Sequence, residues 1–591
     1  MEIHNNTIRP IILLWNHVPS LRKKQIGILL LLMIAVSFFE IISIGAVIPF
    51  LTVFIDPNLL FTSPELIPIF NYFGINSHYK LLVFLTGLFI LLALTAGLMR
   101  VFSLFVSTRI SFALGADLSY ASYRRTLYQP YDVHISRNSS TVINGIAVKV
   151  NLVITSIVIP LLSMLGSLVI MVSIISMMFY IDIIAASFSI LFFSSIYALI
   201  ALLSKRKLLG NSHHIANEST QVIKAIQEGL GSIREILINN TQDQYCKRYR
   251  RADLALRKSQ ASNLFIAQSP RFGIESLGIA FIAVLAFLLI RNEQDAKVVV
   301  PLLGAIALGS QRLLPLMQNV YMSWSNIKGG IGSIVDTISL LDQKEPPYKV
   351  NNVGEALPFE KSLRLSSVSF QYDSTTAAVL ANIDLIINKG EVVGIFGDSG
   401  CGKSTLLDIV MGLLIPTSGD MWVDGKKLTA NDLVAWRANI SNVSQDIFLT
   451  DDSIESNITF GVAKDNVDRA HLKAVINKSK LDVLISQLPL GLETTIGENG
   501  VLLSGGQKQR IGIARALYRE AKIIVFDEAT SALDEKTESH VMSSINSLSQ
   551  ELTVILVTHR LSTLKNCSKL YEMGEGGIKH INSFSDLLIK K

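Results

Sequence analysis

The segment GDSGCGKST at residues 397–405 has the residue types and spacing of a phosphate-binding loop. It follows an apolar run, EVVGIFG, which predicts a strand, and it precedes STLLDIVMGLL, which predicts a helix. Glycines let backbone N–H groups approach phosphate oxygens, Lys403 would neutralise those oxygens, and the Ser404 hydroxyl would reach Mg²⁺. The nucleotide-binding residues predicted in this loop are Gly397, Ser399, Gly400, Cys401, Gly402, Lys403, Ser404 and Thr405.

A second motif, KIIVFDEATSALD, begins at Lys522. Its apolar run at 523–526 predicts a buried parallel strand that ends in two acidic residues. Asp527 would hold the Mg²⁺ shell, and Glu528 would polarise the water that attacks the γ-phosphate. The alternative is that both carboxylates are simply solvated at a loop.

The string VLLSGGQKQR, which precedes the predicted helix IGIARALYRE, resembles the signature of ATP-binding cassette (ABC) proteins. Further elements appear in the order of that family. Tyr372 in FQYDS resembles the aromatic residue that stacks on adenine, and Gln445 in NVSQDIFL resembles the glutamine that senses Mg²⁺. His559 in VTHRLS matches the histidine that contacts the γ-phosphate, although an isolated histidine is more often structural. The signature residues implied to bind nucleotide are Ser504, Gly505, Gly506 and Gln507.

The rest of the 591-residue chain is unusually apolar, with 50% hydrophobic residues and a mean hydropathy of +0.43. Lysine and arginine concentrate before the first apolar segment and in the connections 108–153 and 205–262. Basic residues mark the cytoplasmic side of membrane proteins, so the net charge of +6 indicates cytoplasmic loops rather than a nucleic-acid partner. Six segments have the length and composition of membrane spans: 25–55, 81–107, 154–180, 183–204, 263–290 and 298–321.

The two basic connections have helical composition and are too long to be structureless loops. We therefore expect the spans to continue as long helices into the cytoplasm and to end in short transverse helices near 130–139 and 239–250. A Pro-rich polar linker at 343–360 would separate a membrane domain, 1–342, from a cassette, 361–591. Six spans followed by one α/β P-loop cassette resemble an ABC exporter half-transporter with the type I exporter fold.

The resemblance also implies partners and a mechanism. Two chains would meet head to tail, so that the signature of one chain covers the ATP held by the other. Because this chain carries both Glu528 and an intact signature, a homodimer would have two competent sites. ATP and Mg²⁺ are the implied cofactors.

Charged residues occur inside the predicted spans, where they are costly and therefore informative. Counted from the outer helix ends at about 1.5 Å per residue, Glu40, Glu275 and Arg312 fall at one depth, with Arg271 and Arg100 deeper. One interpretation is an ion-pair network that joins Glu275 to Arg271 and Glu40 to Arg312. The other is that these arginines line the transport path and bind an anionic head group, and both can hold together.

The membrane half resembles bacterial flippases for lipid-linked oligosaccharides in short motifs such as SFFEIISIGAVIPFLTVF and PRFGIESLGIAF. That group has an extra short outer helix, which SPELIPIFNYFGI at 63–75 matches. The resemblance implies an inner-membrane protein that moves an amphipathic lipid outward, with its cassette in the cytoplasm. Export of a peptide, another lipid or a drug, or a non-pumping channel or sensor, are the alternatives.

Overall fold

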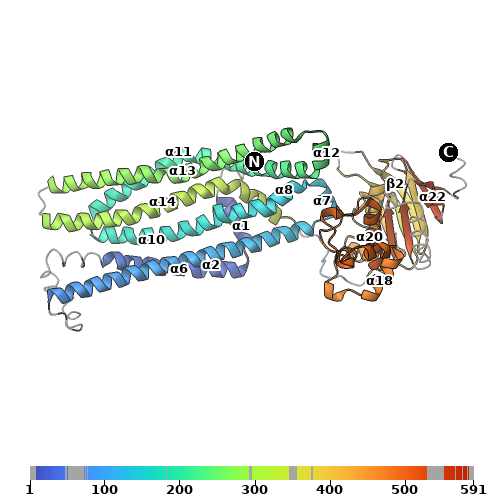
Figure 1. Cartoon of the computed structure of the whole chain (residues 1–591). Helices are drawn as coiled ribbons and strands as arrows, with labels where there is room; N and C mark the ends of the chain where they lie inside the picture. The colour runs from blue at the N-terminus through green and yellow to red at the C-terminus, as the bar shows by residue number, and fades with distance from the viewer. Residues whose placement is uncertain are drawn as a thin grey trace. The chain divides into compact units, whose positions relative to one another are not determined.

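The chain divides into two compact units in the computed structural model (Figure 1). One unit comprises Met1–Gln129 and Arg137–Lys344, and the other comprises Pro130–Ser136 and Glu345–Lys591. The structure describes residues 8–46, 77–181, 183–291, 296–344, 356–373, 377–528, 552–558, 560–565, 567–574 and 577–581, with a few isolated positions besides.

The first unit consists of helices, the longest of which run side by side (Figure 1). Two π-helical turns, Gly145–Lys149 and Ile154–Val158, interrupt the stretch that leads into α10. The helices of this unit are α1 (Ile8–Asn16), α2 (Ser20–Gly45), α6 (His78–Leu127), α8 (Ser139–Asn144), α9 (Val150–Val153), α10 (Ile159–Ile181), α11 (Ile183–Gly231), α12 (Ile233–Ile238), α13 (Gln242–Arg291) and α14 (Ala296–Leu341).

In the described part of the chain, four helical stretches are long and apolar enough to cross a bilayer. They are Ser20–Ser43, His78–Leu127, Ser139–Tyr180 and Ala186–Gly231, and they contain most of the first four predicted spans. The fifth and sixth predicted spans fall on α13 and α14. The predicted outer helix at 63–75 lies almost wholly outside the described residues.

The long helices continue well beyond the bilayer, as the sequence predicts. The 50 residues of α6 extend about 75 Å at about 1.5 Å per residue, more than twice the roughly 30 Å of a hydrocarbon core. The short helix α7 (Tyr131–Ser136) occupies the first predicted transverse position and belongs to the second compact unit.

The second transverse helix was predicted wrongly. The short helix is α12, which precedes residues 239–250, and α13 has already begun at Gln242. Asn240 separates the two helices with a left-handed backbone, φ 53°, a conformation that asparagine tolerates better than most residues. The Asn239–Asn240 pair was therefore the signal for a turn rather than for a helix.

The helices of the membrane unit approach one another closely where α14 meets α11. Gly332 donates its backbone N–H to Ser212 Oγ at 2.8 Å. A Cβ at Gly332 would lie 2.8 Å from the Ser212 carbonyl oxygen, so the contact has no room for a side chain. On α11 itself, a Cβ at Gly210 would meet nothing within 4 Å.

We expect Gly332→Ala to lower the unfolding free energy by about 1–3 kcal/mol, because overpacking against backbone forces the two helices apart. The matched control, Gly210→Ala, should be neutral or stabilising by up to about 1 kcal/mol, since alanine suits a helix interior better than glycine. Thermal unfolding of the purified full-length protein measures both. Equal midpoints for the two variants would contradict the close α11–α14 contact.

The second unit contains a mixed six-stranded sheet in the order β10-β9-β3-β8-β7-β6 and a four-stranded antiparallel sheet in the order β2-β1-β4-β5. Strands β3, β8, β7 and β6 are parallel and largely buried, and β7 confirms the buried parallel strand predicted at 523–526. The described strands are β1 (Ser362–Phe370), β2 (Leu380–Asn388), β3 (Val392–Gly397), β4 (Ser418–Val423), β5 (Lys426–Lys427), β6 (Ile440–Val443), β7 (Ile523–Asp527), β8 (Thr553–Val557), β9 (Lys569–Gly574) and β10 (Gly577–Ile581).

Short helices complete this unit. The two that carry the candidate site are α15 and α20, and both begin next to the motifs singled out in the sequence. The helices are α15 (Lys403–Val410), α16 (Leu433–Arg437), α17 (Ile454–Ile458), α18 (Arg469–Lys478), α19 (Asp482–Gln487), α20 (Gly505–Tyr518) and α22 (Leu561–Leu564).

Candidate functional site

The loop between β3 and α15 curls around a lysine. Lys403 Nζ donates to the carbonyl oxygens of Gly397 at 2.9 Å and Asp398 at 2.7 Å. Gly402 caps α15 with φ 102°, and a Cβ at Gly397 would lie 2.0 Å from the Met573 carbonyl oxygen. Only glycine fits these two positions, and the resulting loop brings its backbone N–H groups to a helix N-terminus, where anions bind favourably.

The carboxyl end of β7 brings an acidic residue to the same loop. Ser404 Oγ donates to Asp527 Oδ2 at 3.4 Å. Burial, and then the charge of Glu528, raise the pKa of Asp527, which Ser404 and Lys403 partly oppose. A divalent cation would relieve this repulsion, and a hydroxyl with a carboxylate is a donor set that Mg²⁺ accepts. Within the described residues no three His, Cys, Asp or Glu side chains lie close enough together to hold a metal ion.

Glu528 follows β7 directly and is partly buried. Its backbone lies in the left-handed region, φ 49°, while its N–H donates to the Val557 carbonyl oxygen at 2.9 Å on β8. A glutamate seldom adopts this conformation, and such strain persists only where neighbouring structure holds it. His559, two residues beyond β8, lies outside the described residues.

Tyr372 stands at the edge of this site with about half of its surface exposed. Its ring packs edge-on against Phe370, with the centroids 5.0 Å apart, and its hydroxyl lies 3.0 Å from Thr405 Oγ1 on α15. The exposed aromatic ring is thus held beside the phosphate-binding loop. Gln445 is exposed in the loop that follows β6.

The signature residues form the start of α20. Ser504 is the N-cap, and its Oγ accepts from the Gln507 N–H at 3.3 Å while its own N–H donates to Gln507 Oε1 at 2.7 Å. This capping box engages two residues that the sequence analysis assigned to nucleotide alone. The N–H groups of Gly505 and Gly506, in the first turn of a 14-residue helix, add a positive dipole end.

Two residues next to the site belong to no motif that was recognised in the sequence. Asp408, on α15, is more than half buried, and burial followed by the charge of Asp527 raises its pKa to about 6. Tyr131, on α7, lies close enough to Asp408 and Tyr372 that their charges, after burial, raise its pKa. The short helix α7 therefore packs beside the residues that surround the phosphate-binding loop.

In the membrane unit, Glu40 is 2% exposed and is paired with two arginines. Arg100 Nε donates to Glu40 Oε2 at 2.9 Å, and a second guanidinium nitrogen contacts Oε1. Arg312 Nη1 lies 3.6 Å from Oε1. The predicted Glu40–Arg312 ion pair is confirmed, but the principal partner of Glu40 is Arg100, a pairing that was not predicted from the sequence.

The length of the arginine side chain explains why this pairing was missed. The estimated depths of Arg100 and Glu40 differ by about 6 Å at about 1.5 Å per residue, and a long arginine side chain bridges such an offset. The predicted pair on α13 is also confirmed, with Arg271 Nε 2.8 Å from Glu275 Oε1. In the described part of the unit, Arg271 pairs with Glu275 while Glu40 pairs with Arg100 and Arg312, so these charges form two groups.

Comparison with known families agrees with this architecture. Residues 26–306 match the model of the ABC transporter transmembrane region, and residues 380–531 match the ABC transporter model. The chain is an ABC transporter. It moves cargo outward at the expense of ATP hydrolysis, with several membrane passes in the inner membrane and the cassette in the cytoplasm.

Individual relatives extend over most of the transporter. The ATP-dependent lipid A-core flippase of Paraburkholderia xenovorans is 27% identical over 531 residues, which cover 87% of this chain and 86% of the relative. ATP-dependent lipid A-core flippase 2 of Colwellia psychrerythraea is 32% identical over 393 residues, 64% of this chain and 65% of the relative. A solved structure described as a bacterial Atm1-family ABC exporter with ATP bound matches at 21% identity, with a TM-score of 0.78 over 96% of both chains. The transporter therefore has the type I ABC exporter fold.

Titration of Asp408 should make the cassette less stable as the pH rises. Its pKa is about 6 when folded and 3.8 when unperturbed, so between these values the folded state keeps a proton that the unfolded chain has released. Stability is then lost as the pH rises through this window and is constant above it. We expect Asp408→Asn to flatten the dependence of the cassette unfolding temperature between about pH 4 and pH 6. Parallel curves for variant and wild type would contradict this assignment.

Proposed function

We propose that the transporter works as a homodimer that flips a lipid-linked oligosaccharide or a related glycolipid from the cytoplasmic to the outer leaflet. The proposal rests mainly on the charge balance around Glu40. Two arginines surround one buried carboxylate, which leaves a net charge of +1, and the side chains of Arg100 and Arg312 are 42% and 50% exposed. An excess cation inside a membrane requires an anion or water.

A phosphate-linked head group would supply that anion. Arginine pairs with phosphate through planar, charge-assisted hydrogen bonds, so a guanidinium held in place by Glu40 is already oriented for it. The lipid A-core flippases among the relatives carry, by name, a lipid cargo. Arg271 and Glu275 neutralise each other, and we assign them a weaker role along the same path.

For the ATP site, we propose that Lys403 and the loop amides bind the phosphates and that Tyr372 stacks on adenine. Ser404, Asp527 and Gln445 would hold Mg²⁺, which neutralises charge on the phosphates when bound. Glu528 would polarise the attacking water, and His559 would contact the γ-phosphate. The first turn of α20, from Ser504 to Gln507, would cover the nucleotide of the second copy, while its capping box keeps that turn rigid.

Replacement of Glu528 separates a pump from a non-pumping member of the family. We expect Glu528→Gln to lower ATPase activity by about 100-fold or more, because proton transfer to a positioned base contributes that much. ATP binding should persist, since the phosphate contacts come from other residues. Vanadate-sensitive phosphate release and equilibrium ATP binding measure the two. A wild-type protein without ATPase activity would overturn the pump assignment.

Replacement of Arg312 tests the cargo-binding role. We expect Arg312→Ala to lower transport by about 10- to 100-fold, the loss of one charge-assisted hydrogen bond, while basal ATPase activity changes little. Arg312→Lys keeps the charge and serves as the matched control, with an intermediate loss. An equal loss of transport and ATPase activity, with poor folding, would mean that Arg312 only stabilises the helices.

The cargo itself is tested in proteoliposomes. ATP-dependent flipping of a short lipid-linked oligosaccharide should exceed that of an ordinary phospholipid and of a cationic drug, and Glu528→Gln should abolish it. Equal movement of the drug would overturn the cargo assignment and leave a general exporter.

A further inference from the structure

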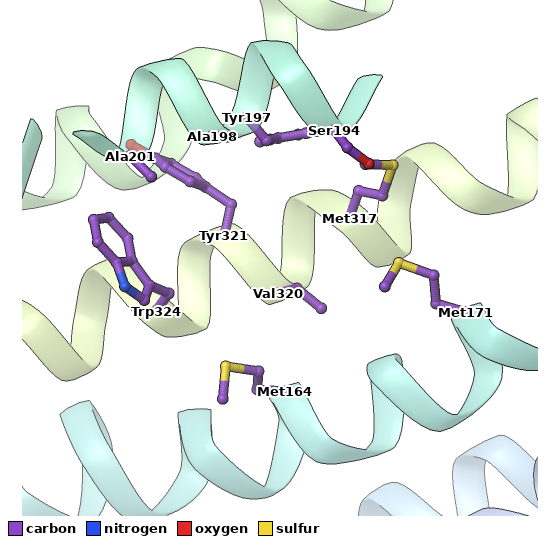
Figure 2. A pocket seen from close by; sticks show the side chains of 10 residues that line it. All are labelled: Met164, Met171, Ser194, Tyr197, Ala198, Ala201, Met317, Val320, Tyr321 and Trp324. Carbon is purple, nitrogen blue, oxygen red and sulfur yellow. The ribbon is translucent and has the colours of Figure 1, made fainter. Parts of the chain in front are cut away.

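A cavity of about 290 Å³ lies between α10, α11 and α14 in the membrane unit. Figure 2 shows Met164 and Met171 on α10, Ala198 and Ala201 on α11, and Tyr321 and Trp324 on α14, which runs between the other two helices in this view. The volume is at the lower end of the range of about 300–1,000 Å³ for ligand pockets. It therefore suits one hydrocarbon chain rather than a whole lipid.

The walls of the cavity are apolar because the nearby polar atoms bind elsewhere. The hydroxyl of Tyr197 donates to Gln318 Oε1 at 3.0 Å, and that of Tyr321 donates to the Ile266 carbonyl oxygen at 3.1 Å. These bonds direct both hydroxyls toward neighbouring helices, so the aromatic rings rather than the hydroxyls line the cavity. Methionine side chains adapt to ligands of variable shape, and such a surface accepts a flexible chain.

Two lysines stand one helical turn beyond the cavity on its cytoplasmic side. Lys205 follows Ala201 by four residues on α11, and Lys328 follows Trp324 by four residues on α14, so each lies on the same helix face as a wall residue. Lys328 is only 8% exposed, whereas Lys205 is exposed. Burial and then the charge of Lys205 lower the pKa of Lys328.

We propose that this cavity is a binding site for an anionic phospholipid of the inner leaflet. One acyl chain would occupy the space between Met164, Ala201 and Trp324, and the phosphate would lie between Lys205 and Lys328. A phosphate carries the charge opposite to that of both lysines, and basic pockets between membrane helices recognise such head groups. This site differs from the Glu40 cluster, which involves α2, α6 and a higher level of α14.

Trp324 offers a direct measurement, because its indole lines the cavity. The chain has four tryptophans; Trp422 and Trp436 belong to the cassette, and Trp15→Phe removes the fourth. The full-length Trp15→Phe protein would be placed in phosphatidylcholine nanodiscs with a minor fraction of brominated phosphatidylglycerol or of brominated phosphatidylcholine. Bromine quenches indole fluorescence on contact, and the Trp15→Phe/Trp324→Phe protein supplies the background.

We expect brominated phosphatidylglycerol to quench Trp324 with an apparent affinity about tenfold higher than brominated phosphatidylcholine, since two lysines attract the anionic head group. Lys205→Gln should remove this preference. The matched control Lys207→Gln should keep it, because residue 207 is two positions further along α11 and faces away from residue 205. Ala201→Leu fills the cavity and should weaken quenching by both lipids while ATPase activity is retained.

Four results would overturn the proposal. Three of them are equal quenching by both brominated lipids, quenching that Ala201→Leu leaves unchanged, and loss of the preference in Lys207→Gln as well as in Lys205→Gln. Displacement of the brominated phosphatidylglycerol by an isoprenoid pyrophosphate without ATP would also overturn it, and would assign the cavity to the tail of the cargo. The site does not depend on the proposed cargo, so failure of the flipping assay would leave it standing.

Discussion

The bilayer supplies no hydrogen-bonding partners, and this constraint shapes the whole membrane unit. Backbone groups satisfy it by forming helices of up to 50 residues. Buried polar side chains satisfy it by bonding across helices, as Asn319 does with Ser163 and Ser167. The carboxylate of Glu40 is the extreme case, since only paired cations make its burial tolerable, and its pairing joins α2, α6 and α14.

The same constraint distinguishes the two groups of charged residues in the membrane unit. Arg271 and Glu275 cancel each other along one helix face and need no further partner. The Glu40 cluster does not cancel, because it holds one cation more than it holds anions. Among the described residues this leaves one positive charge without a matching carboxylate, which is why we propose Arg312, rather than Arg271, as the residue that binds cargo.

In the cassette, backbone strain and repulsion between carboxylates occur near the carboxyl ends of the parallel strands. Glu528 has a left-handed backbone, and the pKa values of Asp527 and Asp408 are raised. Gly397 lies so close to the Met573 carbonyl oxygen that no side chain would fit there. Bound nucleotide and cation would relieve much of this repulsion. The short helix α7, whose chain continues into α6 and α8, carries Tyr131, which lies close enough to Asp408 for their charges to interact.

The sequence alone determined the phosphate-binding loop, the buried strands and the long helices, because each depends on residues close together in the chain. The glycines of GDSGCGKST determine the backbone conformation of the loop, and the composition of an apolar run is enough to predict that the strand is buried. Tertiary structure decided which groups meet. The pairing of Glu40 with Arg100 depends on how α2 lies against α6, and the raised pKa of Asp408 depends on the approach of Asp527. The α10–α11–α14 cavity joins Met164, Ala201 and Trp324, far apart in sequence, because helix packing sets distances that no local pattern records.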